Sequence, residues 1–292
     1  MKKVLFVLTS VFALIWAPAY SQDDLEALLN ANEEEETVIA RYAFKSTRII
    51  NAHSIENVAP GVLDFRILHR FGNINGGAYQ LFGLDQANVR FSFDYGITER
   101  LMVGVGRSNV GKEYDGFVKY RILRQSTGKK EMPVSLSYVG GTIVNSLKWT
   151  DPSRPEPPFS YRMYYYHQLL LARKFNETLT LQLTPTLFHR NWVNTRTEPN
   201  DILALGLGGR VKLNNRVAAT FDYWMVPGDQ LPNYNNTLSV GFDIETGGHV
   251  FQLHFTNSRG MNEKQFITEG NGEWLKGDIN FGFNLSRVFT IR

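Results

Sequence analysis

The chain has 292 residues, no cysteine and a formal net charge of +3, and 43% of its residues are hydrophobic. Without cysteine it forms no disulfides and carries no lipid on a cysteine, which excludes small disulfide-stapled folds and lipoproteins. Lys2 and Lys3 precede an apolar run from Val4 to Trp16, and Ala19-Tyr20-Ser21 then gives a small-x-small cleavage pattern. We expect residues 1–21 to be a signal peptide, cleaved after about Ser21.

An acidic leader is expected over residues 22–45. Residues 22–36 contain seven acidic residues and no basic one, while the loss of Lys2 and Lys3 lowers the formal net charge from +3 to +1. The remainder of the chain is therefore clearly basic. The leader is either a solvated periplasmic segment or a segment that docks into a basic barrel mouth.

No run of about 18 apolar residues follows residue 21, which excludes a helical membrane protein. From residue 61 onward, segments of about ten residues alternate between apolar and polar side chains. Val89, Phe91 and Phe93, for example, alternate with Arg90 and Ser92. Because successive side chains of a strand point to opposite faces, each segment predicts a strand with one apolar face.

Twelve strands are predicted, at 61–71, 87–97, 101–108, 114–123, 133–146, 161–174, 178–189, 201–213, 216–227, 235–245, 249–258 and 276–287. The connections between them alternate between long and short along the chain, with 109–113 the weakest of the long ones. A soluble sandwich has no reason to keep this rhythm, whereas outer-membrane barrels combine long extracellular loops with short periplasmic turns. We therefore predict an all-β fold: a closed antiparallel transmembrane barrel of about twelve strands, with residues 46–292 as the barrel domain in the cell outer membrane.

Residues 46–54 form a further extended candidate. A thirteenth strand would break the even strand number that is usual for such barrels. Three interpretations remain open for this segment: a periplasmic segment, a strand folded into the lumen, or an error in the strand count.

A family resemblance is carried by short motifs spread over residues 44–133. The motifs are Ser46-Thr47-Arg48-Ile49-Ile50-Asn51, His69-Arg70-Phe71-Gly72, Gly83-Leu84-Asp85-Gln86-Ala87, Tyr95-Gly96-Ile97, Gly106-Arg107-Ser108, Tyr114-Asp115-Gly116-Phe117, Lys119-Tyr120-Arg121, Arg124-Gln125 and Met132-Pro133. With them the chain resembles, over about residues 44–290, a bacterial family of predicted outer-membrane β-barrel proteins known only as a domain of unknown function. The resemblance implies the barrel fold and brings no established activity.

Charged side chains on the polar strand faces are the candidate lumen lining. They are Asp64, Arg66, Arg70, Arg90, Asp94, Lys119, Arg121, Asp222 and Asp243. One interpretation is a network of paired charges that fills the interior, since buried charges require partners. The other is a pore lining that selects anions. A filled or narrow interior is the preferred hypothesis.

Candidate residues at the extracellular rim are His69, Asp85, Arg107 and Asp115, from segments expected to meet on neighbouring strands. We expect an Arg–Asp pair there to order the loops, with a small ligand site as the alternative. The run Tyr164-Tyr165-Tyr166-His167 brings further aromatic rings toward the same rim, where such residues form interfacial girdles.

Signatures of enzymes are absent from the sequence: there is no HExxH, GxSxG or P-loop motif. We therefore expect no enzyme, metal or cofactor, apart from a remote chance of a hydrolase at the rim. The favoured function is a narrow channel for small solutes or ions. The alternative is a non-conducting structural or accessory barrel that binds a partner through its extracellular loops. Expected partners are outer-membrane lipid, the barrel-assembly machinery and a small solute or ion, but not nucleic acid.

Overall fold

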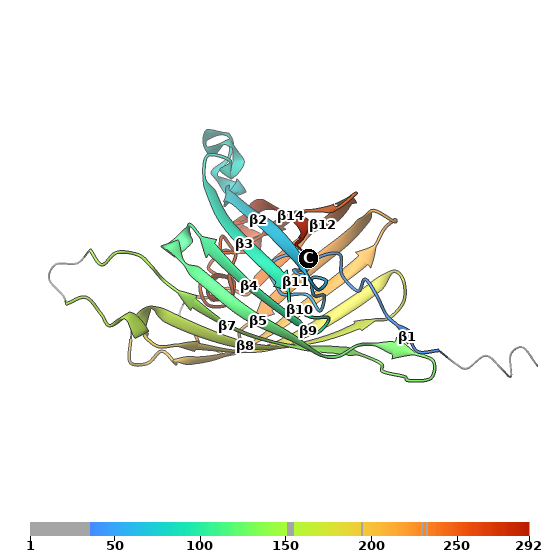
Figure 1. Cartoon of the computed structure of the whole chain (residues 1–292). Helices are drawn as coiled ribbons and strands as arrows, with labels where there is room; N and C mark the ends of the chain where they lie inside the picture. Colours follow the sequence, from blue (N-terminus) through green and yellow to red (C-terminus); the bar gives the residue numbers. More distant parts are fainter. Residues whose placement is uncertain (1–35, 151–154, 194, 229, 232, 292) are drawn as a thin grey trace, which may run out of the picture.

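The computed structural model describes residues 36–150, 155–193, 195–228, 230–231 and 233–291. The expected signal peptide and most of the acidic leader lie outside the described residues. Twelve strands form one closed antiparallel barrel (Figure 1). They are β2 (Val62–Asn73), β3 (Ala87–Gly96), β4 (Leu101–Ser108), β5 (Tyr114–Leu123), β7 (Ser135–Val144), β8 (Met163–Lys174), β9 (Leu179–Arg190), β10 (Asp201–Lys212), β11 (Val217–Met225), β12 (Thr237–Thr246), β13 (His249–Thr256) and β14 (Asn280–Thr290).

Each barrel strand pairs with the next one along the chain, and β14 pairs with β2 to close the ring. The prediction of a closed antiparallel barrel of about twelve strands is thus confirmed. A separate two-stranded sheet joins β1 (Val38–Ile39) to β6 (Ser126–Thr127) in the connection between β5 and β7. This small sheet fixes the start of the described chain at the rim that carries the short turns.

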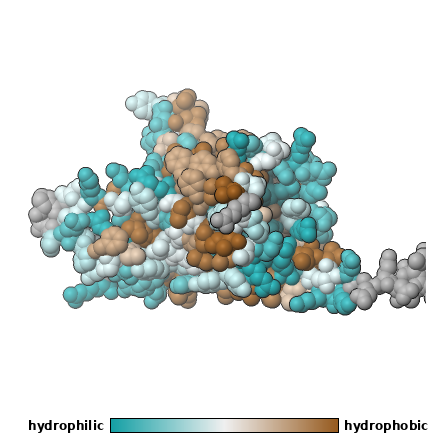
Figure 2. Space-filling model, in the orientation of Figure 1, coloured by the Kyte–Doolittle hydropathy of each residue, from teal (hydrophilic) through white to brown (hydrophobic). Residues whose placement is uncertain are grey.

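Alternating exposure separates the two faces of the barrel wall. In β9, Leu183 is 42% exposed whereas the adjacent Thr184 is 1% exposed. The outer surface accordingly carries many large apolar side chains (Figure 2). The inner wall carries polar and charged side chains instead. A wall with this division is matched to lipid outside and to a polar interior.

The connections lie at two rims. The short turns after β3, β8, β10 and β12 share one rim with the β5–β7 connection, and by analogy with outer-membrane barrels this rim faces the periplasm. The extracellular connections include the short helices η1 (Ile74–Gly76), η2 (Ala78–Gly83), η3 (Val110–Lys112), η4 (Phe159–Arg162), α3 (Glu263–Thr268) and η5 (Trp274–Lys276). Among the described residues, no helix is long and apolar enough to cross a membrane.

Candidate functional site: the filled lumen

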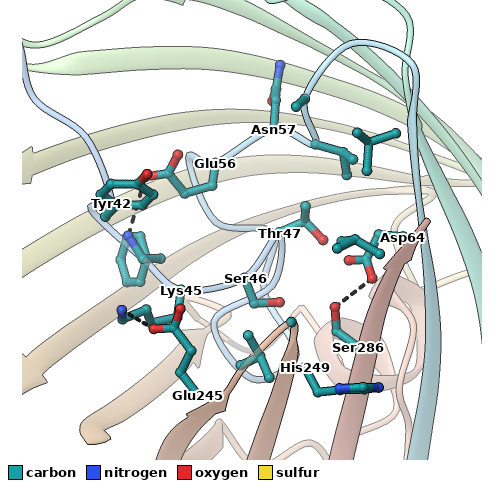
Figure 3. Close-up of a pocket in the computed structure, with 17 residues that line it drawn as sticks. Tyr42, Lys45, Ser46, Thr47, Glu56, Asn57, Asp64, Glu245, His249 and Ser286 are labelled. Carbon is teal, nitrogen blue, oxygen red and sulfur yellow. Dashed lines mark hydrogen bonds and ion pairs between the residues drawn. The ribbon is translucent and has the colours of Figure 1, made fainter. Parts of the chain in front are cut away.

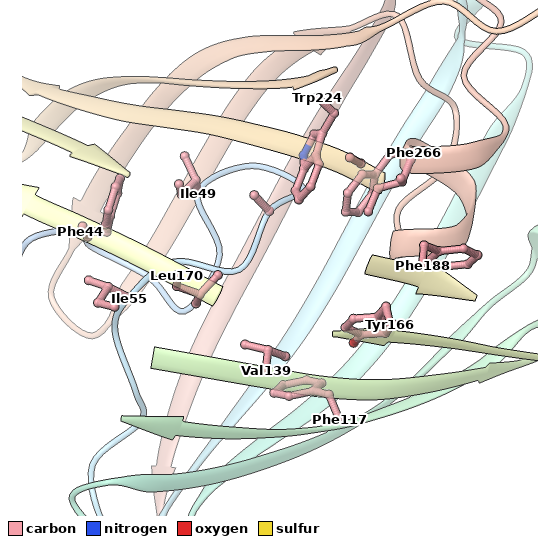
Figure 4. Close-up of a cluster of buried hydrophobic side chains, with 14 of the residues drawn as sticks. Phe44, Ile49, Ile55, Phe117, Val139, Tyr166, Leu170, Phe188, Trp224 and Phe266 are labelled. Carbon is pink, nitrogen blue, oxygen red and sulfur yellow. The ribbon is translucent and has the colours of Figure 1, made fainter. Parts of the chain in front are cut away.

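Residues 43–58, here called the inner segment, run inside the barrel. Most of this segment is buried, and Ile50, Asn51 and His53 are fully enclosed. It reverses direction in a tight turn, with hydrogen bonds from Ile49 N to Ala52 O (2.8 Å) and from Ser54 N to Thr47 O (2.9 Å). Figure 4 shows the turn within the ring of strands. Of the three interpretations left open by the sequence, the lumen location is therefore the one that applies, although the segment forms a turn and not a strand.

Polar side chains of the inner wall bind the peptide groups of the inner segment. These hydrogen bonds join Asp222 Oδ2 to the N–H groups of Asn51 and Ala52 (2.6 and 3.2 Å), Gln252 Nε2 to the carbonyl of Ile49 (2.6 Å), Asn284 Nδ2 to that of Ile50 (3.0 Å) and Gln182 Nε2 to that of His53 (2.7 Å). A non-helical segment inside a barrel needs such partners, since unpaired buried peptide groups are costly. The wall is thus complementary to the backbone of this segment.

Side chains of the inner segment are held as well. Arg66 Nη1 donates to Ser46 Oγ at 2.5 Å and to Thr47 Oγ1 at 2.7 Å. The Thr47 hydroxyl in turn donates to Asp94 Oδ2 at 3.0 Å. Two charged side chains of the wall therefore fix neighbouring residues of the segment.

At the periplasmic entrance the inner segment borders a cavity of about 410 Å³ (Figure 3). An ion pair between Lys45 and Glu245 spans one side of it, and Ser286 Oγ donates to Asp64 Oδ1 at 2.5 Å on another. The first contact ties the inner segment to β12, and the second joins β14 to β2 beside the cavity.

From the extracellular side, the loop that contains α3 folds into the same lumen. Asn262 caps this helix by accepting a hydrogen bond from Gln265 N (3.1 Å), and its Nδ2 donates to Glu113 Oε2 (2.8 Å). Burial alone would lower the pKa of Lys264, but the carboxylates of Glu269 and Glu113 raise it above its ordinary value. Lys264 is thus a charged anchor, 2.8 Å from Glu113.

The two intruding segments meet inside the barrel. Arg48 Nη1 of the inner segment lies 2.6 Å from Glu263 Oε1 of α3, and both side chains are buried. His53 Nε2 lies 3.3 Å from the same oxygen. Nearby, the rings of Trp224 and Phe266 are 5.2 Å apart and pack against the apolar cluster shown in Figure 4. The lumen is therefore filled from both ends.

All nine candidate lumen residues lie in the interior, each at most 8% exposed. Several are paired: Arg66 with Asp64 at 3.5 Å, and Arg90 with Asp115, where Arg90 Nε donates to Asp115 Oδ1 at 2.9 Å. Others bind the chain itself, as Lys119 does at the carbonyl of Glu56. Their placement supports the interpretation of a filled interior. Ion selection by these residues stays a prediction.

The candidate rim residues are not brought together. Asp85 is exposed between η2 and β3, and His69 stacks on the lipid-facing ring of Phe283 with centroids 5.0 Å apart. Arg107 and Asp115 do not pair with each other. In the β4–β5 register Arg107 is paired with Tyr114 and points outward, whereas Asp115 is the next residue and points inward to Arg90. Side chains on opposite faces of the barrel wall cannot meet.

The run from Tyr164 to His167 is divided by the same alternation: Tyr166 is fully buried inside, whereas His167 is exposed outside. Sequence reasoning missed the role of Glu113 and Glu263, which lie in connections where no period assigns a face. It placed Gln182 and Asn284 on polar faces without singling them out. The only sequence signal for Gln182 and Asn284 was an amide side chain at a position that the alternation assigns to the inner face of a strand.

Among the described residues, no group of three or more His, Asp or Glu side chains is placed to hold a metal ion. The expectation of a non-enzymatic protein stays a prediction.

The fold and the filled interior define an outer-membrane β-barrel with an internal plug made by its own chain. The chain belongs to the family described as a membrane bound beta barrel domain, whose model matches residues 44–289. The search of curated proteins found no match.

Solved barrel structures show weak overall similarity to this chain. A NanC porin structure has 10% identity, covers 78% of this chain and 98% of its own, and gives a TM-score of 0.49. The outer membrane protein Omp33 of Acinetobacter baumannii has 7% identity, coverages of 78% and 97%, and a TM-score of 0.41. OmpT, an outer membrane protein of Vibrio cholerae, has 10% identity, coverages of 78% and 96%, and a TM-score of 0.37.

Proposed function

We propose that this protein is a non-conducting accessory barrel of the outer membrane, which acts through its extracellular loops while its lumen stays occupied. This is the second of the two functions considered from the sequence. The observation that carries it is the binding of the inner segment by its peptide groups. A wall that hydrogen-bonds the backbone of one particular turn, through Asp222, Gln252 and Asn284, favours a resident structural element over a water-filled path.

The contacts of several interior charges also favour an occupied lumen over a narrow channel. A selective pore needs a continuous row of accessible polar groups that bind an ion weakly enough to release it. Here Arg66 and Asp94 are engaged by residues of the inner segment, and Arg90 by Asp115. Charges that are already satisfied in this way have little capacity to bind a passing solute.

A gated channel is the second candidate, because some basic groups of the interior form no ion pair in the described part of the chain. Arg70 donates to the amide oxygen of Asn51, and Arg210 Nη1 to the backbone carbonyl of Tyr42 at 3.4 Å. Withdrawal of the inner segment would leave these guanidinium groups facing the space that the segment had occupied. Such a pore would prefer anions.

The two functions are separated by conductance of the purified, full-length mature protein in planar bilayers. The chain has no cysteine, so the double variant Asn51→Cys, Ser239→Cys can form a single disulfide, which locks the inner segment to β12. In the native protein Asn51 Nδ2 lies 2.8 Å from Ser239 Oγ at this place. We expect no stable conductance steps from the reduced or the oxidised double variant, or from the native protein. Steps that appear on reduction and vanish on oxidation would overturn the proposal in favour of a gated channel.

The lock has a matched control. The single variant Ser239→Cys cannot form this disulfide. We therefore expect the conductance of this variant to be the same under reducing and oxidising conditions. The gel mobility of unheated samples of both proteins, compared with that of heat-denatured samples, shows whether the barrel is folded.

A further inference from the structure

The outer wall is hollowed between β7 and β10. A hollow of about 600 Å³ is lined mainly by Leu169, Pro185, Leu187, Leu203, Leu205 and Pro227. Leu187 lies three residues before the extracellular end of β9 and Leu203 two residues after the extracellular start of β10. Leu169 and Pro185 lie near the middle of β8 and β9, so the hollow extends from the middle of the wall toward the extracellular rim.

A break in strand pairing accompanies the hollow. The β8–β9 pairs run from Tyr164↔Arg190 to Gln168↔Thr186 and resume only at Leu171↔Leu183. Pro185 lies in this gap and has no N–H group for the β8 side of the ladder. The indentation thus coincides with the break in strand pairing at Pro185, and short side chains are not its only cause.

A polar pair borders the hollow on the lipid-facing side. The hydroxyl of Tyr138 and Nδ1 of His167 are 2.6 Å apart, and the two rings are stacked with centroids 6.0 Å apart. Gly140 makes room for the pair, because a Cβ at this position would lie 2.7 Å from the Tyr138 hydroxyl. Ionisable groups within a membrane are costly, and they commonly mark functional positions.

We propose that the hollow is a binding site for an acyl chain of an outer-leaflet lipid, with the Tyr138–His167 pair meeting an oxygen-bearing part of that lipid. The hollow continues the lipid-facing wall and is almost wholly apolar. Water has few polar partners in such a space. An acyl chain suits this apolar lining, and the polar pair gives the site a place at which a hydroxyl or ester oxygen is recognised. This proposal does not depend on whether the lumen conducts.

Lipid retained after purification tests the site. The native protein, Leu187→Trp and Leu253→Trp are washed in detergent and reloaded with either a diacyl phosphatidylglycerol or a lipopolysaccharide, and bound lipid is counted by native mass spectrometry. Leu187 is 40% exposed in the hollow, and Leu253 is 38% exposed on the outer face of β13, away from it. We expect at least one retained lipid for the native protein and for Leu253→Trp, and a several-fold loss for Leu187→Trp.

The two lipid arms identify the source of the acyl chain, and Tyr138→Phe tests the polar pair. With the hydroxyl removed, we expect retention to fall while folding, followed by heat-dependent gel mobility, is unchanged. Equal retention by the native protein and Leu187→Trp would overturn the acyl-chain site. The site would also be overturned if the native protein were a dimer without bound lipid and Leu187→Trp made it a monomer. The wall of a second copy would then fill the hollow.

Discussion

Arg48 Nη1 and Glu263 Oε1 lie 2.6 Å apart within the barrel, although one residue enters the lumen from the periplasmic side and the other from the extracellular side. Two segments that are 215 residues apart in the chain thus share one buried ion pair. Removal of one partner from such a pair leaves an uncompensated buried charge.

Glu263→Gln and Arg48→Met are each expected to lower the free energy of unfolding by about 3–5 kcal/mol, measured by urea unfolding in a lipid-like detergent. The double variant should lose clearly less than the sum of the two, because no charge is then left unpaired. Glu273→Gln is the control, since its pair with Lys276 is solvent-exposed and should contribute little to stability. Fully additive losses would show that the two side chains do not stabilise each other.

Asp222→Asn tests how the wall holds the turn of the inner segment. The carboxylate accepts the N–H groups of Asn51 and Ala52, and hydrogen bonds to charged groups contribute about 1.5–3 kcal/mol. Loss of the charge should therefore accelerate amide exchange at these residues by about tenfold or more. Hydrogen–deuterium exchange measures the change, and Asp85→Asn in the exposed loop is the control. Unchanged protection of residues 51 and 52 would contradict the anchoring role.

The opposite faces of Arg90 and Arg107 give a third prediction. Arg90 is fully buried and held by Asp115 through two contacts, whereas Arg107 lies outside over the ring of Tyr114, 5.4 Å from its centroid. Arg90→Met should destabilise the barrel by about 3 kcal/mol or more, since it strands Asp115 in the interior. Arg107→Met should cost about 1 kcal/mol or less. Urea unfolding of the two variants side by side decides the point, and similar losses would contradict the assigned faces.

The barrel strands could be predicted because a period of two assigns each residue to lipid or lumen. Once Val89, Phe91 and Phe93 are placed outside, Arg90 must lie inside, and the structure agrees. The same rule places Arg107 outside on β4 and Asp115 inside on β5, so these two rim candidates cannot pair. A shared rim location alone does not bring two side chains together.

Which segments fill the lumen, and through which contacts, could not be predicted in this way. The inner segment has few residues in regular pairing, and its place is fixed by long-range contacts such as Gln252 with Ile49, which are 203 residues apart. α3 lies in a connection with no period at all, so Glu263 looked like an ordinary loop residue. Contacts between irregular segments depend on the closed barrel and leave no local pattern in the sequence.

Gly208 and Ile49 provide the last test, because the wall lacks a side chain where the inner segment comes close. A Cβ added at Gly208 would lie 2.3 Å from Ile49 Cδ1, so Gly208→Leu should push the turn away from the wall. We expect faster amide exchange in residues 47–54 and a loss of about 1–3 kcal/mol from overpacking. Gly116→Leu is the matched control, since a Cβ at Gly116 meets no atom closer than 3.7 Å. Combining Gly208→Ala with Ile49→Ala should restore most of the protection that Gly208→Ala loses, because the second change removes the clashing methyl group. If Gly208→Leu left exchange in the inner segment unchanged, Ile49 would not pack against β10 in the folded barrel.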